Sequence, residues 1–562
     1  MIREAFGVMR DLPRLHEISS VLVRYGLGDI VRRIGIAGLL ERAGQILHWR
    51  VADDTAQLDP PQRVRQALEE LGPMFVKLGQ MLATRVDLLP PNWINELEKL
   101  HSKVPPVAFD ALLPELERAL GRSPFDVFPD LEIAAFGSAS IAQVHRARLA
   151  DGTRVVLKIR RPGIRPKIEA DLRIVAHIAA LIEAEMPEAR RYRPTEIVAE
   201  FARSLERELD FAMEARNVER IAKNFEGDPF IVIPRVFPEW TSESLNVQEH
   251  VDAILGTDAA KVTAAGLDRR LLAQRGAAAV LKMILVDGFF HADPHPGNVF
   301  YLPGNRIAMI DFGMVGRLSP QRRNQVVDLL AGFARMDEEA MLDVLLDWAD
   351  EAAIDESKLG LALSDLAFDY EGAALKTIHI GTLIRQFATI LRDHSILMPA
   401  DLTLMFKALI TMEGLGRQFD PDFRIIEHLT PLLERVIADR HRPGAILKRG
   451  QNALNQFLNS VASVPRDLAR LLRDARRGKT RIDLDLKRLD HFGRQLDRTI
   501  DRATMGILTA SLVIGSSIVM TVQGGPTLIG MPVFTALGLF GYVIAFINSA
   551  WIILGIWRSG KQ

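Results

Sequence analysis

Apolar residues recur at helical spacing in several segments of the chain, and one short segment has the composition of a strand instead. Amphipathic helices are predicted over 18–40, 165–185 and 195–217. The run Arg-Val-Val-Leu-Lys-Ile at 154–159 is apolar and β-branched, which favours a strand, and Asp-Gly at 151–152 predicts a hairpin turn before it. The pattern therefore indicates an α+β protein.

The C-terminal part has a different pattern. Residues 503–557 include no Asp, Glu, Lys, Arg or His. Two apolar stretches, 505–522 and 533–557, are each long enough to cross a hydrocarbon layer of ~30 Å, and a Gly-Gly-Pro turn separates them. This predicts a transmembrane helical hairpin at 503–562, against the alternative of a helical pair buried in a soluble core. Because both flanks are basic, the preceding domains are expected in the cytoplasm, at the inner membrane.

The segment before this hairpin, 451–502, is predicted to be a basic amphipathic linker. Leu489, Phe492, Leu496 and Ile500 fall on one helical face. Its excess of basic residues favours contact with anionic lipid headgroups, so a membrane lipid bilayer is an expected partner.

Composition changes this picture only a little. A chain of 562 residues is expected to hold more than one domain. The net charge of −1 gives no bias toward nucleic acid, and the lack of cysteine excludes disulfides and thiolate metal sites. The first 50 residues do not have the pattern of a signal peptide.

The most informative motif is His-Ala-Asp-Pro-His-Pro-Gly-Asn at 291–298, followed by Asp-Phe-Gly at 311–313. Asp293 and Asn298 have the spacing of the base and the metal-binding amide in a kinase catalytic loop. Asp311 matches the carboxylate that holds Mg²⁺ on nucleotide phosphates. We therefore expect ATP and Mg²⁺ as cofactors, with Asp293 catalytic and with Asn298 and Asp311 as metal ligands.

Two simpler interpretations compete with this one. Asp-Phe-Gly alone is often only a turn. His291, Asp293 and His295 would share one face of a strand and could bind a transition metal. Pro294 and Pro296 interrupt such a strand, however, and a bare metal site leaves Asp-Phe-Gly unexplained, so nucleotide chemistry is favoured.

A kinase-like site also needs a lysine on a strand and an acid on a helix to orient it. Lys158 on the predicted strand is a candidate for contact with the α- and β-phosphates. The following helical segment contains Glu206, Glu208, Asp210 and Glu214. Composition leaves the choice among these four acids open.

The glycine-rich loop that covers the phosphates in kinases is altered here. Small residues that could still bring backbone N–H groups to phosphate are Gly137, Ser138, Ala139 and Ser140. The Cβ atoms of Ala139 and Ser140 restrict positive φ, so we expect a different loop shape. No Ala-Pro-Glu follows Asp-Phe-Gly, and Ser319-Pro320 instead predicts a helix start, which leaves almost no activation segment.

Taken together, these residues resemble the UbiB family of atypical protein-kinase-like proteins, which is required for ubiquinone biosynthesis. The resemblance also rests on Lys-Leu-Gly-Gln at 77–80, Gln-Val-His at 143–145 and Glu-Leu-Asp-Phe at 208–211. It covers about residues 60–320, and the apolar C-terminus looks like the two-helix anchor of bacterial members.

The resemblance implies roles for individual residues. Lys158 would be paired with Glu214, and Glu208 and Asp210 would form the Glu-x-Asp motif of the nucleotide site. The helix with Lys77, expected to be catalytic, and Gln80, expected to bind ATP, would fold over that site and obstruct a protein substrate. A solvated surface lysine is the simpler interpretation of Lys77.

The expected architecture is a two-lobed kinase-like core with helical additions. Its parts are a helical extension (1–125), an N-lobe (126–250), a C-lobe with a helical continuation (251–450), the linker (451–502) and the hairpin (503–562). Residues 244–250 are expected to form the hinge strand.

The function implied is that of an ATP-binding, Mg²⁺-dependent kinase or ATPase that supports ubiquinone biosynthesis. Isoprenoid ubiquinone precursors and the enzymes that modify them are the expected partners, and a homodimer is compatible with the sequence. The alternative is a non-catalytic, nucleotide-gated scaffold for those enzymes. A flavin monooxygenase is set aside, because no G-x-G-x-x-G follows an early strand.

Overall fold

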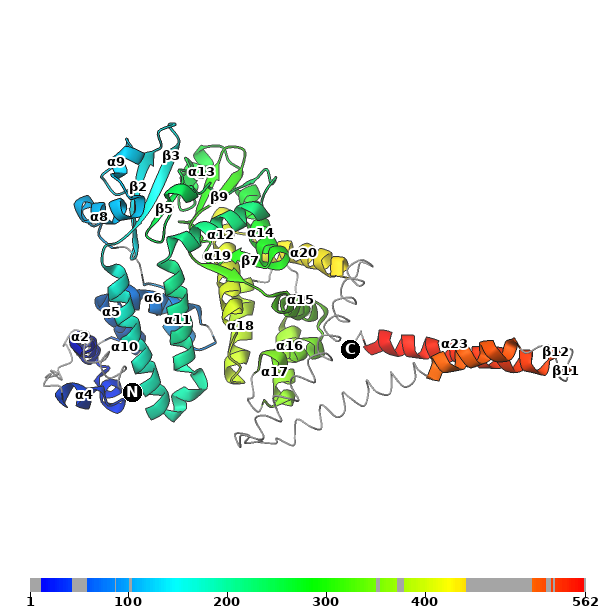
Figure 1. The fold of residues 1–562 in the computed structure, drawn as a ribbon. Coiled ribbons are helices and arrows are strands. Elements are labelled where there is room, and N and C mark those ends of the chain that lie inside the picture. Colours follow the sequence, from blue (N-terminus) through cyan, green and yellow to red (C-terminus); the bar gives the residue numbers. More distant parts are fainter. Residues whose placement is uncertain are drawn as a thin grey trace, which may run out of the picture. The chain divides into compact units, whose positions relative to one another are not determined.

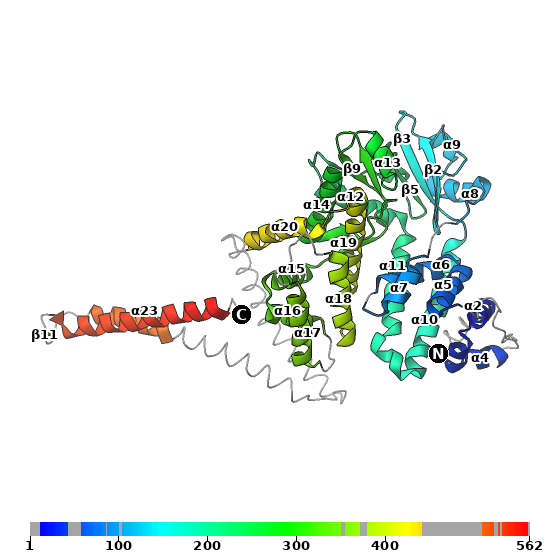
Figure 2. The same cartoon turned by 180° about the vertical axis from the view of Figure 1, so that it is seen from behind.

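The computed structural model of the protein describes residues 12–42, 58–85, 87–100, 104–349, 354–370, 379–440, 508–521, 527–528 and 531–559. The chain forms two compact units, Met1–Arg440 and His441–Gln562. In the first unit the strands form small sheets and most of the remaining chain is helical (Figures 1 and 2), as expected for an α+β protein.

The N-terminal region of the first unit is helical. Its helices are α2 (Leu12–Arg24), α3 (Gly28–Arg33), α4 (Ile36–Arg42), α5 (Pro60–Leu71), α6 (Pro73–Thr84), α7 (Pro91–Leu97), α8 (Phe109–Leu120) and α9 (Pro124–Val127). The helical pattern predicted over 18–40 is interrupted because Gly26 and Gly35 have φ of 78° and 77°, which ends each helix. The apolar side chains of α2–α4 are buried in one cluster with residues of α10 (Ile164–Glu185), so these helices pack on the body of the protein.

A four-stranded antiparallel sheet follows, in the order β1-β2-β3-β5. Its strands are β1 (Gly137–Ser138), β2 (Ala142–Arg148), β3 (Arg154–Arg160) and β5 (Leu245–Glu249). Val155, Leu157 and Ile159 alternate along β3 and are buried together with apolar residues of α8. Because side chains alternate across a strand, Lys158 lies on the opposite face. The predicted turn before β3 is present, with Gly152 at φ 86°.

Helices inserted between β3 and β5 carry part of the site. They are α10, the 3₁₀ helix η2 (Pro187–Tyr192), α11 (Pro194–Glu208) and α12 (Phe211–Asn224). Figure 1 shows α10 and α11 as a long hairpin beneath the sheet. The single helix predicted over 195–217 is wrong, because Asp210 is extended (φ −104°, ψ 95°) and starts a new helix.

The rest of the first unit combines short strands with long helices. A second sheet has the order β4-β9-β8-β6, and β7 pairs with β10. These strands are β4 (Ile231–Val232), β6 (Ile254–Leu255), β7 (Phe289–His291), β8 (Val299–Leu302), β9 (Arg306–Met309) and β10 (Val315–Arg317). The helices are η3 (Pro238–Trp240), α13 (Ala259–Ala264), α14 (Arg269–Lys282), η4 (Met283–Asp287), α15 (Pro320–Arg335), α16 (Glu338–Trp348), α17 (Glu356–Asp369), α18 (Ile380–Asp393), α19 (Ala400–Phe419) and α20 (Ile425–Arg440).

One large apolar core joins these helices to the second sheet. Ser319 caps α15 by accepting from the N–H of Arg322, and Pro320 is the first helical residue, as predicted. Glu413 of α19 accepts from the N–H groups of Ile380 and Gly381 at 3.3 Å each, and so satisfies the start of α18 from a neighbouring helix.

The second unit contains a helix over 508–520, the strands β11 (Thr527–Leu528) and β12 (Met531–Pro532), and α23 (Val533–Ser559). The two-helix transmembrane hairpin predicted here is not supported. Within the ranges that the structure describes, no helix combines the length and the apolar character that a membrane crossing requires. The predicted apolar face of the basic linker lies outside the described residues.

Gly79 allows α5, α6 and the end of α7 to pack closely, which generates a test of this packing. A Cβ at Gly79 would lie 2.3 Å from Leu100 Cδ1 and 2.8 Å from Leu68 Cδ1. Overpacking costs about 1–3 kcal/mol, against about 1 kcal/mol that alanine gains over glycine in a helix. Gly79→Ala should therefore lower the denaturant midpoint of unfolding.

Gly414 in α19 is the matched control, because nothing lies within 4 Å of a Cβ built there. Gly414→Ala should leave the midpoint unchanged or raise it slightly. Equal midpoints for the two variants would contradict the packing described for Gly79.

Candidate functional site

Lys158 lies at the centre of a cluster of charged side chains. Its ammonium donates to both carboxylate oxygens of Glu214, at 3.0 and 2.9 Å, and to Asp311 Oδ1 at 3.2 Å. Glu214 is in the first turn of α12 and is 3% exposed. Of the four acids that composition left open, the structure therefore pairs the strand lysine with Glu214.

The three groups shift the pKa values of one another. Burial disfavours the charge of Lys158, but Asp311 and Glu214 outweigh burial and raise its pKa. Burial would raise the pKa of Asp311, yet Lys158, with His291 and Lys77, outweighs burial and holds that pKa well below its ordinary value. Burial raises the pKa of Glu214 to about 7, although Lys158 opposes this shift. Glu214 and Asp311 thus share the ammonium of Lys158.

Asn298 and Asp311 are brought together by the hairpin of β8 and β9. Asn298 directly precedes β8, and Asp311 follows β9 by two residues, while Val299 and Met309 pair across the strands. The N–H of Ile310 donates to the Asn298 carbonyl at 3.0 Å. The two predicted metal ligands therefore lie at the same end of one hairpin.

The catalytic loop holds Asp293 by its backbone. The Asp293 N–H donates to His291 Nδ1 at 3.2 Å, and its carbonyl accepts from the Asn298 side-chain amide at 3.3 Å. The His291 ring packs on Phe312, with ring centroids 4.9 Å apart. The side chain of Asp293 is 30% exposed.

The alternative metal site at His291, Asp293 and His295 is not supported. His291 Nδ1 and His295 Nδ1 accept from the N–H groups of Asp293 and Gly297. Among the described residues, no group of three His, Asp or Glu is arranged to hold a metal ion.

Lys77 belongs to the same cluster. Its ammonium forms an ion pair with Glu208, the last residue of α11. Burial disfavours the charge of Lys77, but Glu208, Asp311 and Asp293 together outweigh burial and raise its pKa. Lys77 is therefore not the solvated surface lysine of the simpler interpretation.

Asp210 shapes the turn after Glu208. Its Oδ1 accepts from the N–H groups of Ala212 and Met213, at 3.0 and 3.1 Å, and so caps α12. The cap fixes the start of the helix whose first turn holds Glu214. Asp210 thus supports the position of Glu214. This structural role is separate from the nucleotide-binding role predicted for Asp210.

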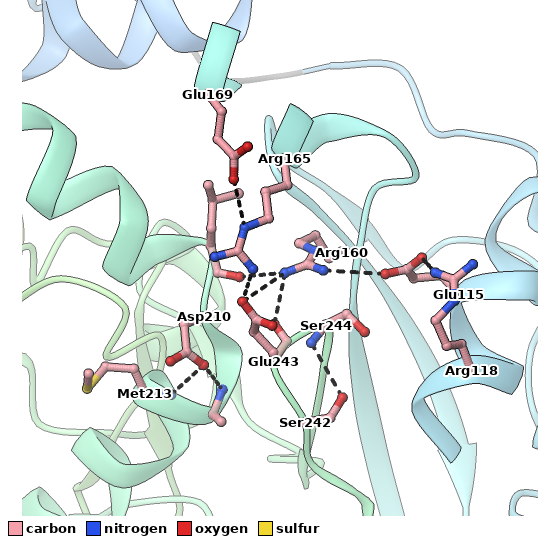
Figure 3. Close-up of polar contacts among 12 residues, drawn as sticks. Glu115, Arg118, Arg160, Arg165, Glu169, Asp210, Met213, Ser242, Glu243 and Ser244 are labelled. Carbon is pink, nitrogen blue, oxygen red and sulfur yellow. Dashed lines mark hydrogen bonds and ion pairs between the residues drawn. The ribbon is translucent and has the colours of Figure 1, made fainter. Parts of the chain in front are cut away.

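Arg160, two residues after Lys158 on β3, braces the same turn (Figure 3). It donates to the carbonyls of Leu209 and Glu243, at 3.0 and 3.4 Å. Arg165 forms an ion pair with the Glu243 side chain, and Arg160 Nη2 lies 3.5 Å from Glu115. Sequence reasoning missed Arg160, although its spacing puts it on the same face as Lys158.

The small-residue loop is held by another missed arginine. Arg161 donates to the Ala139 carbonyl at 2.8 Å and to Ser138 Oγ at 2.6 Å. The Ala139 N–H donates to the Ala142 carbonyl, and Ser140 is 2% exposed. At least one N–H of the loop is therefore used within the chain, which agrees with a shape unlike that of a glycine-rich loop.

Two glutamines of the motifs contact backbone. Gln80 donates to the Leu100 carbonyl at 2.9 Å, which links α6 to the segment after α7. Gln143 exchanges hydrogen bonds with the backbone of Val107.

A further missed residue is Lys407 of α19, whose ammonium lies 3.1 Å from Asp293 Oδ2. The sequence feature that could have pointed to Lys407 is its place as the one charged residue in the stretch 402–412.

The residues fit a nucleotide with Mg²⁺. Asn246 on β5 pairs in register with Lys158, is 0% exposed, and has no hydrogen-bond partner at either side-chain atom. A buried amide of this kind calls for a polar partner. Mg²⁺ requires only one or two protein carboxylates besides phosphate and water. Asp311, with a side chain 46% exposed, and the Asn298 oxygen can supply that set.

Acidification is expected to destabilise the core through His291. Burial lowers the pKa of His291 to about 4, so the unfolded chain, with a histidine pKa of about 6.5, takes up the proton first. As the pH falls from 6.5 to 4, this group should remove about 3 kcal/mol from the free energy of unfolding. In His291→Phe the denaturant midpoint should therefore fall less over this range than in the wild type.

His177 on α10, which is partly exposed, provides the control. His177→Phe should keep the wild-type dependence on pH. The same dependence in both variants would contradict the role assigned to His291.

Comparisons with known proteins show which family the chain resembles. Residues 99–345 match the ABC1 atypical kinase-like domain, 363–424 the UbiB helical domain, and 487–558 the ABC1/UbiB kinase-like C-terminal domain. A probable protein kinase UbiB of Pseudomonas fluorescens (strain Pf0-1) is 34% identical over 81% of this chain and 86% of that protein. The protein of the same name from Aliivibrio salmonicida is 34% identical over 78% of this chain and 81% of its own length.

A solved structure, the complex of Rv3197 with erythromycin from Mycobacterium tuberculosis, has a TM-score of 0.42 and 20% identity, and the match covers 69% of this chain and 98% of that one. A similarity of this size carries no information about the site. The kinase-like and helical family matches, together with relatives 34% identical over about four fifths of the chain, show that this protein belongs to the UbiB family of atypical kinase-like proteins.

Proposed function

We propose that the protein binds ATP with Mg²⁺ and acts as an atypical kinase or ATPase. The observation that carries this proposal is the contact of Lys158 with both Glu214 and Asp311, beside Asn298. A strand lysine oriented by a helix glutamate, with an acid and an amide at one hairpin end, is the set that phosphoryl transfer uses.

Each residue has a role in this proposal. Lys158, held by Glu214, would contact the α- and β-phosphates. Asp311 and Asn298 would hold Mg²⁺, which when bound neutralises charge on the nucleotide phosphates. Asp293 would accept a proton from the acceptor or orient a water molecule. The chain thus supplies positioned charges, which is most of what this reaction needs.

The phosphoryl acceptor is proposed to be small, either water or a lipid. A protein acceptor would need an exceptional site to reach the cluster. The ion pair of Lys77 with Glu208 supports this, because it ties α6 to the cluster on which a protein substrate would have to dock. Gly79 and the leucines around it hold α6 in that place.

The biological role that we propose is support of ubiquinone biosynthesis at the cytoplasmic face of the inner membrane. Isoprenoid precursors or the enzymes that modify them would be the partners, with a homodimer as the proposed assembly. Family membership supports this role.

A non-catalytic, nucleotide-gated scaffold is the second candidate. It is favoured by two observations: the Ala139 N–H is used within the chain, and the Asp293 carboxylate is held by Lys407. The two functions differ in whether phosphate release accompanies nucleotide binding.

Replacing Asp311 by Asn should reduce phosphate release from ATP by roughly 100-fold or more, because it removes the charge that holds Mg²⁺. Chelation of Mg²⁺ from the wild type should have the same effect. The measurement is phosphate release by the full-length protein in lipid vesicles, with γ-labelled ATP to show where the label ends.

Asp252→Asn is the matched control, because Asp252 is an exposed acid that pairs with Arg154. It should keep wild-type turnover. Wild-type turnover in Asp311→Asn would refute the catalytic proposal, whereas nucleotide binding without phosphate release in the wild type would favour the scaffold.

A further inference from the structure

The helical region C-terminal to the kinase-like domain contributes a cation to the site. Lys407 of α19 lies with its ammonium 3.1 Å from Asp293 Oδ2. Asp293 falls within the matched atypical kinase-like domain, at 99–345, whereas Lys407 falls within the matched helical domain, at 363–424. The catalytic-loop carboxylate is thus held by a residue from outside the kinase-like domain.

The position of Lys407 is set by a buried helix. Its neighbours Met405, Phe406, Ala408 and Leu409 are all less than 10% exposed in the large core. Packing against α14 is close, since a Cβ at Gly276 would lie 2.7 Å from the Met412 methyl. α19 also contacts β10, just after Asp-Phe-Gly, and α6, which carries Lys77. Because α19 is packed on several sides, the position of the Lys407 ammonium beside Asp293 is fixed.

The pair is a poor device for stability. The side chains of Lys407 and Asp293 are 25% and 30% exposed, and ion pairs with this much solvent contribute less than about 1 kcal/mol. A lysine within the largely apolar stretch 402–412 of this helix is costly to place there for so small a gain. The pair is better explained by what its groups can do together in the site.

The chemistry of the ammonium points to phosphate. An ammonium has three donor hydrogens, so Lys407 can pair with Asp293 and still donate to a further acceptor. The backbone of Asp293 is already held by His291 and Asn298, so Lys407 is not needed to place the loop. Lysine is a common phosphate ligand that acts as a point charge. The terminal phosphate is the part of a nucleotide that must approach Asp293 for transfer.

We propose that Lys407 is a nucleotide-binding residue: it pairs with Asp293 in the nucleotide-free protein and donates to the terminal phosphate of a bound nucleoside triphosphate. This inference rests on the proposed function of the site. It adds a third lysine to Lys77 and Lys158, and it makes the helical region part of the nucleotide site.

The test compares a triphosphate analogue with a diphosphate. Full-length protein with Mg²⁺ is titrated with the non-hydrolysable imido analogue of ATP and with ADP, by calorimetry. Lys407→Met keeps the length of the side chain and removes its charge. It should weaken the triphosphate analogue by roughly 10-fold or more and leave ADP within about 2-fold, because the lost contact is one charge-assisted hydrogen bond. Lys407→Arg should recover most of the loss.

Two controls separate this inference from other effects. Lys358→Met, at an exposed lysine of α17 that pairs with Asp355, should change neither affinity. In an Asp293→Asn background, Lys407→Met should still weaken the triphosphate analogue selectively, whereas a residue that only holds Asp293 would have no remaining effect. Thermal melting shows whether each variant is folded. If Lys407→Met does not fold, Lys407→Gln is used in its place.

Equal losses for the two ligands, or no loss for either, would overturn the role of Lys407 while leaving the nucleotide site itself intact. Absence of any nucleotide binding by the wild type would instead overturn both the proposed function and this inference.

Discussion

The single positive charge of Lys158 is shared by two carboxylates from different parts of the chain, and the arrangement of the site depends on this sharing. Glu214 comes from a helix start and Asp311 from a strand end, and both contact the ammonium within 3.2 Å. Glu214 is almost fully buried, and the lysine compensates the charge of that carboxylate there. The three groups therefore link β3, α12 and the end of the β8–β9 hairpin through one cation.

The helices outside the kinase-like domain are components of the site. α6 brings Lys77 to Glu208, and α19 brings Lys407 to Asp293. Each helix is fixed by close packing, at Gly79 in one case and between Gly276 and Met412 in the other. The position of these charges thus depends on apolar packing as well as on the ion pairs.

Much of the site was predictable because its chemistry is concentrated in short segments. Asp293, Asn298 and Asp311 fall within one loop and one hairpin, so spacing alone was sufficient to group them. The strand with Lys158 was recognisable because β-branched residues surround the lysine.

The remaining features depend on contacts that spacing does not encode. The choice of Glu214 over its neighbours required the break at Asp210, which a continuous helical pattern concealed. The hydrogen bond from Gln80 to the Leu100 carbonyl joins segments 20 residues apart, and Lys407 is brought to Asp293 only by the packing of α19. The apolar C-terminal pattern predicted a membrane hairpin that the described helices do not support.

The backbone conformation at Asp311 limits which residue types can occupy this position. Its φ of 59° lies in the left-handed region, which asparagine, aspartate and glycine adopt more readily than other residues. Alanine or serine at this position would strain the chain as well as remove the carboxylate. Asparagine is therefore the substitution that removes the charge and keeps the backbone conformation. A related chain that had lost phosphate chemistry would still accept only a few residue types at this position, because the main-chain conformation excludes the others.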